Sequence, residues 1–453
     1  MKKFHSFVLL FTLLLLTACG PLDIGVEPMA TPLPATIVIP TALPTIDTPA
    51  PTAAPALPTQ TVTPTLAPTA SPSGPDLHLK AGTPVKIIAT HMLGAQNGWA
   101  VGESDQDLVQ HVLFTSDSGK TWRDTTPQAV LGDVPAVGLA VDAYFSSADS
   151  AWALFSPRTP GGPVSQKGLV VWHTSDGGKS WVASQPLDLS GLREGTVEYQ
   201  APSYLGFLDG QLGWVMIHLG AGMSHDYFAA FTTSDGGMHW KLILGPDTQY
   251  PIMSCEKSGL TFTSAASGWI TGNCPGLMPK LFIFHTADGG TTWAEADLPV
   301  PPGKPENYFA SGIACGINTF DYSSPRSLAL TLTCTNYNNN TAQSWLYTSS
   351  DAGQTWNQHL LPAPVTRIGL LNPQEGFLVG SLVSGEDATG AVYHTTNSGA
   401  DWQLTTSTGW TGLPDFVDSQ NGWVAATHSQ VTAFVRTTDG GRTWVELKPV
   451  IGS

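Results

Sequence analysis

The sequence contains little charge, and least of all positive charge. Only 12% of its 453 residues are Asp, Glu, Lys or Arg, and 35 acidic residues outnumber 19 basic ones. The net charge of −16 excludes the basic stripes with which nucleic-acid-binding proteins neutralise phosphates, so no nucleic-acid partner is expected. The chain also lacks a P-loop, a GxGxxG motif and a histidine cluster. We therefore expect no nucleotide, redox or metal cofactor.

Long hydrophobic runs are missing as well, except near the N-terminus. Lys2 and Lys3 precede an apolar run at residues 7–16, which is typical of a signal peptide and too short for a transmembrane helix. The run ends in Leu-Thr-Ala-Cys-Gly at 16–20, which resembles the lipobox of bacterial lipoproteins. The resemblance implies a signal peptide at 1–19 and lipidation of Cys19. It places the protein at the bacterial cell surface or periplasm, lipid-anchored to the outer face of a membrane. An ordinary secretory signal with an incidental cysteine stays open as the alternative.

Aromatic residues are absent from the next segment, residues 20–76. Residues 21–75 contain 14 Pro and 11 Thr and few charges, a composition that cannot bury enough apolar surface to fold. We expect a disordered Pro/Thr-rich linker that holds the following domain, residues 77–453, clear of the membrane or through a cell-wall layer.

What the domain does contain is a repeat of eight residues, Thr/Ser-x-Asp/Asn-x-Gly-x-x-Trp, which we call the turn motif. The Asp or Asn can close a turn onto its own backbone, the Gly two residues later can adopt positive φ, and the Trp can anchor the returning strand in an apolar layer. The motif therefore predicts a hairpin turn. Its seven acidic or amide residues are Asp117, Asp176, Asp235, Asp288, Asp351, Asn397 and Asp439, and its tryptophans are Trp122, Trp181, Trp240, Trp293, Trp356, Trp402 and Trp444.

A second pattern precedes the Asp or Asn of each turn motif by 16 to 24 residues. It consists of a bulky apolar residue, turn-forming residues and then an apolar segment that begins, in most copies, with Gly-Trp, as at Gly98-Trp99. Each unit thus predicts four strands, A to D, with the turn motif between C and D. Since such units cannot bury their faces singly but a closed ring of them can, we predict an all-β, seven-bladed β-propeller over 77–453. Residues 77–84 could add a strand to the last blade.

Cysteine is scarce: besides Cys19 the chain has only Cys255, Cys274, Cys315 and Cys334. Relative to Trp269 the first two lie at −14 and +5, and relative to Ala329, its equivalent in the next unit, the last two lie at the same offsets. We therefore predict the disulfides Cys255–Cys274 and Cys315–Cys334, each across the A–B hairpin of its own blade. A four-cysteine metal site is disfavoured because the sequence has no CxxC spacing.

The turn motif resembles the Asp-box, or BNR repeat, of sialidases, sortilins, xyloglucanases and photosystem II assembly factors. With the Gly-Trp-x-x-Gly segments, as at Gly98–Gly102, the chain over 85–447 is most similar to the photosystem II stability and assembly factor family. That resemblance implies a seven-bladed propeller with one Asp-box hairpin per blade. It specifies the fold rather than the partner.

The Asp-box residues should sit in turns around one rim, too far apart to converge on a substrate, so we interpret them as structural. Binding residues are expected on the opposite rim, where the B–C and D–A connections are long. Those connections are 156–168, 218–226, 335–343 and 381–390, together with 182–201, 294–311 and 403–414. The candidate binding residues are Tyr199, His225, Asp226, Tyr308, Arg367, Trp410 and Asp415; further candidates are Tyr204, Tyr337, Arg158, Arg193, Asp142 and Asp321.

The expected function is a monomeric, non-enzymatic scaffold that binds a protein or a glycan through this rim. The alternative is an exo-acting glycoside hydrolase, either sialidase-like or xyloglucanase-like, which would need two facing carboxylates. A sialidase would also need an arginine triad, yet the chain has only seven arginines and no Arg-Ile-Pro motif. No catalytic residue is assigned.

Overall fold

The computed structural model describes residues 76–453, apart from short gaps. The gaps are 159–167, 191, 193–199, 223–224, 248–251, 275–280, 312, 319–320, 325–326, 340, 365–367, 382–389 and 429–430. The chain divides into two units, Met1–Thr65 and Leu66–Ser453, and every described residue belongs to the second unit. The signal peptide, Cys19 and the linker up to residue 75 therefore lie outside the described residues.

The described residues form six β-sheets, of which four are four-stranded antiparallel meanders. These four are β5 (Leu139–Phe145), β6 (Ala151–Pro157), β7 (Val171–Thr174) and β8 (Val182–Ala183); β9 (Ala201–Phe207), β10 (Gly213–Gly222), β11 (His225–Thr233) and β12 (Lys241–Leu244); β22 (Ile368–Leu370), β23 (Gly376–Ser381), β24 (Gly390–Thr395) and β25 (Gln403–Thr408); and β26 (Thr411–Phe416), β27 (Gly422–His428), β28 (Val431–Thr437) and β29 (Val445–Leu447).

The other two sheets contain the same meander with additions. One has β1 (Lys86–Met92), β2 (Gly98–Glu103), β3 (Gln110–Thr115) and β4 (Thr121–Asp124), to which β30 (Val450–Ile451) is added. The nine-stranded sheet holds β13 (Glu256–Phe262), β14 (Gly268–Asn273), β15 (Phe282–Thr286) and β16 (Ala294–Glu295), then β17 (Ala314–Ile317), and then β18 (Asp321–Ser324), β19 (Ser327–Asn336), β20 (Thr341–Ser349) and β21 (Asn357–Leu360). The fusion through β17 was not expected from the repeat.

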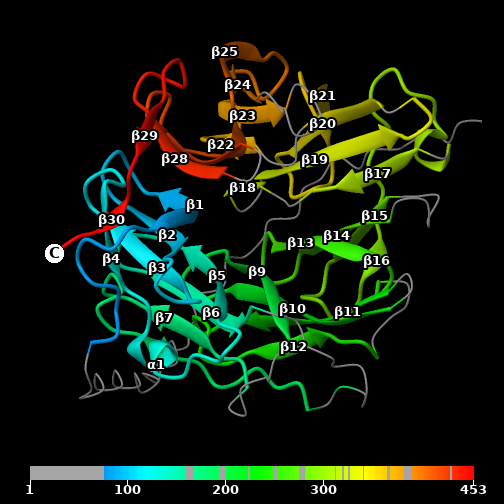
Figure 1. Ribbon diagram of the computed structural model, residues 1–453. Helices are drawn as coiled ribbons and strands as arrows, with labels where there is room; N and C mark the ends of the chain where they lie inside the picture. Colours follow the sequence, from blue (N-terminus) through cyan, green and yellow to red (C-terminus); the bar gives the residue numbers. More distant parts are fainter. Residues whose placement is uncertain are drawn as a thin grey trace, which may run out of the picture. The chain divides into compact units, whose positions relative to one another are not determined.

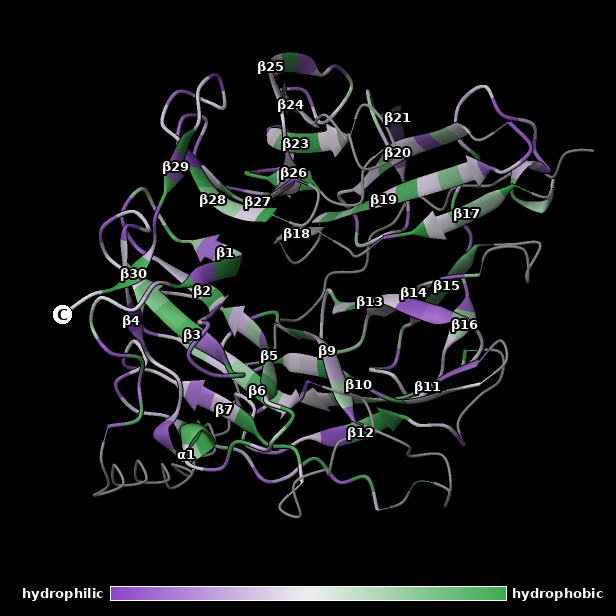
Figure 2. Ribbon diagram, in the orientation of Figure 1, coloured by the Kyte–Doolittle hydropathy of each residue, from purple (hydrophilic) through white to green (hydrophobic). Residues whose placement is uncertain are grey.

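The strands form because each repeat alternates apolar segments with turn residues. In Figure 2 hydrophobic colours run along strands such as β3, while hydrophilic colours are frequent in the connecting loops. The second strand of most meanders starts with a Trp or Phe that is buried between neighbouring sheets, and Trp99, Trp152, Phe377 and Trp423 are at most 1% exposed. The core therefore consists of apolar layers between adjacent sheets.

These sheets follow one another around a common centre, as in a β-propeller (Figure 1). Indole N–H groups connect neighbours: Trp99 donates to the Ser147 carbonyl and Trp152 to the Gly236 carbonyl, each at 2.8 Å. Trp423 of the last sheet donates to the Ser118 carbonyl of the first sheet at 3.0 Å. The same kind of bond thus links successive sheets and closes the ring.

The chain ends complete the closure in a way the sequence did not predict. Residues 77–84 form no strand; instead β30 joins the first sheet and runs parallel to β4. Ile451 then accepts a hydrogen bond from Gly82 and donates one to Thr83, at 2.8 and 2.9 Å. The extra strand expected from residues 77–84 is therefore supplied by the C-terminal β30, which joins the first sheet. Residues 82–85 hydrogen-bond to the segment 449–451 and add no strand to the last sheet.

Two helical turns complete the described part, α1 (Gln128–Leu131) and the 3-10 turn η1 (Tyr308–Ala310). Neither approaches the length needed to cross a membrane.

Both predicted disulfides are present: Cys255 is bonded to Cys274 and Cys315 to Cys334, with Cα separations of 5.2 and 4.0 Å.

Candidate functional site

The seven turn motifs share one hydrogen-bond pattern, seen well in the first copy. Asp117 Oδ1 accepts from the backbone N–H groups of Lys120 and Thr121, at 3.2 and 2.9 Å, and its Oδ2 accepts from the Thr121 hydroxyl at 2.7 Å. The Thr115 hydroxyl donates to Asp117 and accepts the Gly119 N–H at 3.0 Å. The carboxylate thus satisfies the donors of its own turn.

These bonds stabilise the ionised carboxylates. Burial would raise the pKa of Asp117, Asp176 and Asp235, but hydrogen bonds from their own turns outweigh it, and the pKa of each lies below its usual value. For Asp288, Asp351 and Asp439, hydrogen bonds led by the threonine four residues later lower the pKa to about 2. Such carboxylates are poor general acids near neutral pH.

The turn requires two consecutive residues at positive φ, one more than expected. The glycine two residues after the Asp has φ between +78° and +90° in all seven copies. The residue before that glycine also has positive φ, and it is not glycine in three copies: Ser118 at 69°, Ala352 at 60° and Ser398 at 62°. These three copies therefore keep a conformation that costs a residue with a side chain free energy.

One copy reverses the chemistry of the pair that closes the turn. Asn397 stands in place of Asp, and position 401 carries Asp where five copies have Thr or Ser and one has His239. The Asn397 amide donates to Asp401 Oδ2 at 2.9 Å, and its Oδ1 accepts the Asp401 backbone N–H. In this copy the first residue donates and the residue four positions later accepts, the reverse of the other copies. The turn therefore keeps one side-chain hydrogen bond and one carboxylate.

The turn motifs and the A–B turns lie on the same rim. In six of the sheet repeats a backbone N–H of the turn motif bonds a carbonyl of the A–B turn, as from Gly177 to Asp149 and from Gly236 to Gln211. The opposite rim carries the B–C and D–A connections, and we call it the loop rim. The binding candidates were predicted there.

The predicted long loops at 218–226, 335–343 and 403–414 are largely strand. The hairpins β10–β11 and β19–β20 simply continue outward, with strands of nine and ten residues, and 403–414 holds most of β25 and β26. Polar, turn-like composition concealed these strands because their outer residues have few apolar neighbours. We call the outer ends of β10, β11, β13, β14, β17, β19 and β20 the platform.

The platform is tied across sheets. Asn273 of β14 pairs with Gly316 of β17, and the Ser258 hydroxyl bonds the Ile317 carbonyl. The two disulfides lie in the same region, Cys315–Cys334 between directly opposed residues of β17 and β19. Three successive meanders thus support the platform as one braced surface.

Asp226, a predicted binding residue, lies inside the platform rather than on it. Its side chain is mostly buried: Oδ1 lies 2.9 Å from His218 Nδ1, and Oδ2 accepts the Lys257 backbone N–H at 3.1 Å. The Lys257 ammonium lies 3.9 Å from the same Oδ2. Asp226 thus holds β10, β11 and β13 together and orients a histidine whose side chain is 20% exposed. A histidine held this way can bond a ligand.

Lys257 was not singled out from the sequence, yet it is the centre of this cluster. Lys257 is 2% exposed, and its ammonium donates to the carbonyls of Cys255 and Ser254 at 2.7 and 3.0 Å. It also lies over the rings of Phe228 and Phe282. Burial lowers its pKa to about 8, against the opposing influence of Asp226. Lysine is among the commonest surface residues, so only the three-dimensional contacts identify it.

The other described candidates are mostly engaged in packing. Tyr308 is buried in η1 against Trp345, and Trp410 packs edge-on to Trp444 at 5.2 Å. Both were expected on the rim, but the segments that carry them fold back onto the sheets. His225 stacks with Tyr227 at 5.8 Å.

Two carboxylates among the candidate binding residues connect inner strands instead. Asp415 accepts the Met92 backbone N–H at 2.8 Å, and Asp142 accepts the Leu205 backbone N–H at 3.1 Å. Burial raises the pKa of Asp415, opposed by the charge of His91. Each therefore joins the first strand of one sheet to the first strand of the next.

Of the remaining candidates, Tyr204 donates to the Lys257 carbonyl at 3.1 Å, and Arg158 pairs with Glu103 at 2.6 Å. Tyr337, at the tip of the β19–β20 hairpin, is 71% exposed. Tyr199, Arg193 and Arg367 lie outside the described residues, and of Asp321 only the backbone is described.

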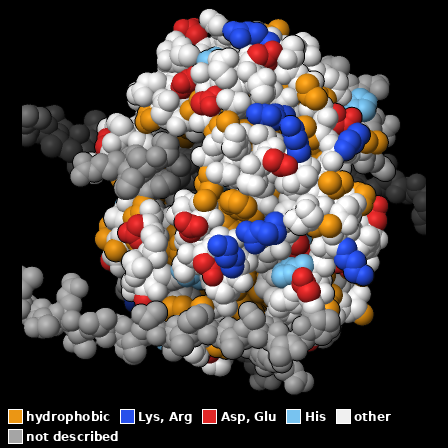
Figure 3. Space-filling view, turned by 90° about the vertical axis from the view of Figure 1, so that its left-hand side faces the viewer, with side chains coloured by type: hydrophobic (Ala, Val, Ile, Leu, Met, Phe, Trp, Pro, Cys, Tyr) orange, Lys and Arg blue, Asp and Glu red, His pale blue; other side chains and the backbone are white. Residues whose placement is uncertain are grey.

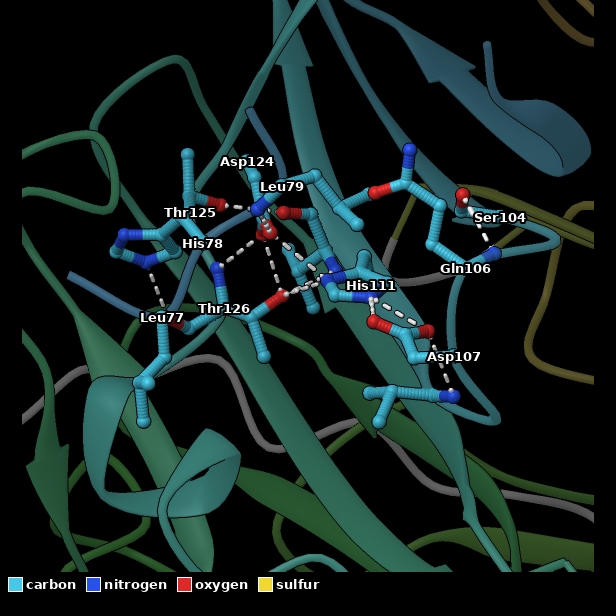
Figure 4. A network of polar contacts seen from close by, with 12 residues as sticks. Leu77, His78, Leu79, Ser104, Gln106, Asp107, His111, Asp124, Thr125 and Thr126 are labelled. Carbon is cyan, nitrogen blue, oxygen red and sulfur yellow. Dashed lines mark hydrogen bonds and ion pairs between the residues drawn. The ribbon is translucent and has the colours of Figure 1, made fainter. Parts of the chain in front are cut away.

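A second polar network lies at the start of the first sheet (Figure 4). His111 is fully buried, with Nδ1 2.8 Å from Asp124 Oδ2 and Nε2 3.2 Å from Asp107 Oδ2. Burial would lower the pKa of His111, but the two carboxylates outweigh it and raise the pKa. Asp124 also accepts the Leu79 backbone N–H at 3.0 Å. The network therefore fastens the segment that leads into β1.

The part of the chain that the structure describes contains no group of three or more His, Cys, Asp or Glu placed to hold a metal ion. One pocket of about 610 Å³ lies between residues 93–97 and 147–148, and another of about 550 Å³ lies beside Arg123. Both are on the turn-motif side rather than on the platform.

Comparison with known proteins gives distant similarities. No family model matches the chain. A xyloglucanase from Paenibacillus sp. is 24% identical over 336 residues, which cover 64% of this chain and 30% of that protein, so the chain spans less than a third of that relative. Among solved structures, YCF48 from Cyanidioschyzon merolae has a TM-score of 0.42 at 14% identity, over 81% of this chain and 98% of that one. The GH74 xyloglucanase from Xanthomonas campestris has 0.46 at 12% identity, over 82% and 54%.

Proposed function

We propose that this protein is a binding scaffold without catalytic activity, which engages a protein or a glycan through the loop rim. The observation that carries the proposal is that the carboxylates of the loop rim and the inner strands accept hydrogen bonds from other strands. Asp142, Asp226 and Asp415 each bond another sheet or strand, and a glycosidase needs two acids free to face its substrate. A braced platform with an exposed aromatic tip is suited to recognition instead.

The proposal includes the architecture and the location. We count β13–β16 and β18–β21 as separate blades, which gives seven, and we interpret the turn motif as the Asp-box. We further propose that Cys19 carries the lipid anchor, that 20–76 is the linker, and that the ring lies outside the cytoplasm. The two disulfides support that location because they persist in oxidising compartments.

A glycoside hydrolase is the second candidate, and the xyloglucanase relative favours it. The two functions separate in one experiment. The full chain is incubated with xyloglucan and with a sialylated glycan, and released reducing ends are measured beside retention of the polymer. The scaffold predicts retention or no interaction, without release. Release that disappears in Asp142→Asn or Asp415→Asn, but not in the exposed control Asp297→Asn, would establish the hydrolase instead.

The partner is then sought by crosslinking and co-purification of the full chain from its native membrane, with protein and sugar identified by mass spectrometry. Tyr337→Ala and His225→Ala change the outer ends of the two long hairpins, whereas Leu360→Ala changes an exposed residue of an outer strand. The proposal expects recovery of the partner to fall for the hairpin variants only. Equal recovery with all three would exclude the loop rim as the binding surface.

A further inference from the structure

The turn-motif rim carries a charge pattern that the hydrogen bonding of the turns does not require. Three residues after the Asp, no described side chain bonds the Asp carboxylate, although Arg442 donates to the Asp439 backbone carbonyl at 2.9 Å. This position is basic in three copies, Lys120, Lys179 and Arg442, and uncharged in the other four, Met238, Thr291, Gln354 and Ala400. Because the ring closes between the last and first sheets, the three basic copies are neighbours. With Arg123 we call them the cationic arc.

The members of the arc are not neutralised by ion pairs. All four are exposed, and among the described residues none has a carboxylate within 4.0 Å, although Lys86, Arg158, Lys257 and Lys448 each have one. Figure 3 shows the side that lies at the left of Figure 1, where Lys and Arg side chains are spread over the face with acidic side chains between them. Four cations without an ion pair set the arc apart in a chain of net charge −16.

Arg123 is held in a fixed position at the edge of a pocket. One Nη donates to the Gly177 carbonyl at 2.7 Å, and the guanidinium lies over the Phe114 ring, 5.8 Å from its centre. A guanidinium has five N–H donors, so most of its donor capacity remains for a ligand. The pocket beside it measures about 550 Å³, within the range of small-molecule sites, and Lys179, Ser116, Thr121 and Trp122 also line it.

Asp76 and Asp124 also line the pocket, and Asp176 and Asp124 interact electrostatically with Arg123, but all three carboxylates have hydrogen-bond partners of their own. Asp176 accepts four hydrogen bonds within its own turn, and Asp124 is paired with the buried His111. Asp76 accepts hydrogen bonds from His78 and Gln128. An incoming anion therefore does not have to displace an acidic side chain from Arg123 or Lys179.

We propose that this pocket binds an acidic sugar residue of a polysaccharide, with its carboxylate on Arg123 and Lys179, and that Lys120 and Arg442 contact neighbouring acidic residues of the same polymer. The pocket joins cationic groups to hydroxyls and to the partly exposed ring of Phe114, which suits a charged sugar ring. A membrane surface is the less suitable occupant, because Arg123 and Lys179 line a pocket rather than a flat face and the molecule as a whole is acidic. This surface lies on the rim opposite to the one proposed for the scaffold function, and it does not depend on that function.

The test uses the full chain and labelled oligogalacturonate, with the methyl-esterified oligomer as a probe of the same backbone without charge. Binding is followed by fluorescence anisotropy at low ionic strength. Arg123→Gln with Lys179→Gln should weaken binding of the acidic probe by about tenfold or more, since each removes a charge-assisted contact. Binding of the esterified probe should be weak in all forms.

A second pair of variants keeps the test independent of folding. Arg123 also bonds Gly177, whereas Lys120→Gln with Lys179→Gln removes only exposed ammonium groups and should weaken binding too. The matched control, Lys86→Gln with Lys241→Gln, removes the same charge elsewhere and should leave the affinity within about twofold, because screened surface charges act weakly at a distance. Equal loss in arc and control variants, equal binding of the esterified probe, or tighter binding to vesicles of anionic phospholipid would each overturn the proposal.

Discussion

The two rims of this propeller use the same side chain, aspartate, in opposite ways. On the turn-motif rim each Asp bonds residues within four positions of itself, and the pattern returns around the ring. On the platform, Asp226 bonds Lys257, 31 positions away, and the arrangement occurs in one place. The comparison teaches that repetition stabilises one rim with identical local turns, while the other rim is stabilised by particular contacts between distant residues.

Removal of Asp226 should have the largest effect, because it leaves a buried ammonium without its counter-charge. We expect Asp226→Ala to lower the free energy of unfolding by about 3–5 kcal/mol in denaturant titration at pH 7. Asp235→Ala, in the turn motif that follows the same strand, should cost about 1 kcal/mol, as the loss of a local capping bond does. If Asp226→Ala lowered the free energy of unfolding as little as Asp235→Ala, the contacts between distant residues would stabilise the platform no more than local turns stabilise the other rim.

The pH dependence sharpens this comparison. Lys257 has a pKa of about 8 in the folded protein and 10.5 in the unfolded chain, so the folded state binds fewer protons between these values and its stability rises with pH. Loss of the Asp226 charge lowers the pKa of Lys257 further, so in Asp226→Ala the deficit should shrink as the pH rises towards 8 and stay constant above it. Replacement of Lys257 by Met in the same chain should recover most of the deficit at pH 7.

The next effect in size concerns the glycine of the turn motif. Gly353 has a φ of +89°, and an added Cβ would lie 2.4 Å from Cζ2 of Trp269, in the neighbouring meander of the same nine-stranded sheet. Gly353→Ala should cost about 2–4 kcal/mol, from backbone strain and the displaced indole together. Gly303 has a φ of +77° with nothing near its Cβ, so Gly303→Ala isolates the strain at about 1–2 kcal/mol. Equal costs in denaturant titration would contradict the packing of the turn against Trp269.

The exchanged pair Asn397 and Asp401 gives a smaller effect. Asn397→Asp places two carboxylates where an amide now donates to one, which should cost about 1 kcal/mol at neutral pH. Addition of Asp401→Thr should restore stability, because it recreates the arrangement of the other copies. The deficit of the single variant should diminish on acidification, since the raised pKa of a carboxylate pair lets one of them protonate. Failure of the double variant to recover would mean that the copies are not interchangeable.

The smallest effect is a gain. Ala352 has a φ of 60° in a turn where other copies have glycine, so Ala352→Gly should raise stability by about 0.5 kcal/mol, the strain relieved less the entropy of glycine. Ser118→Gly should give no gain, because the Ser118 hydroxyl bonds the Ala95 carbonyl at 2.7 Å. Thermal unfolding of the two variants measures the difference, and a loss of stability in Ala352→Gly would contradict it.

The same contrast explains what could be predicted from the sequence. The turns, the strand order within each meander and the disulfides follow from motifs whose parts lie within about twenty residues, so their spacing is visible in the chain. The sheet fusion at Asn273 and Gly316, the place of β30, and the burial of Tyr308 against Trp345 depend on contacts across 37 to 329 residues. No local pattern encodes these contacts.

The candidate site was less predictable for the same reason. Asp226 was chosen for its place in a predicted long loop, 218–226, and its neighbours Lys257 and His218 carried no sequence signal. Asp415 and Asp142 were candidate binding acids, whereas their role depends on backbone N–H groups of a neighbouring sheet. The cationic arc, in contrast, is visible in the sequence once the copies are aligned and the ring is known to close.

The pairing of β30 with β4 and with residues 82–85 also determines how the ring bears mechanical force. Any pull on the chain at Asp76 reaches the ring through the bond from Leu79 to Asp124 and then through the bonds of Gly82, Thr83 and Val85 to residues 449–451. These bonds connect both ends of the domain to β4, so tension on the N-terminal side is shared with the C-terminal strand instead of peeling the first sheet from the last. A domain held by a tether at this end would thus be pulled where hydrogen bonds join its two ends.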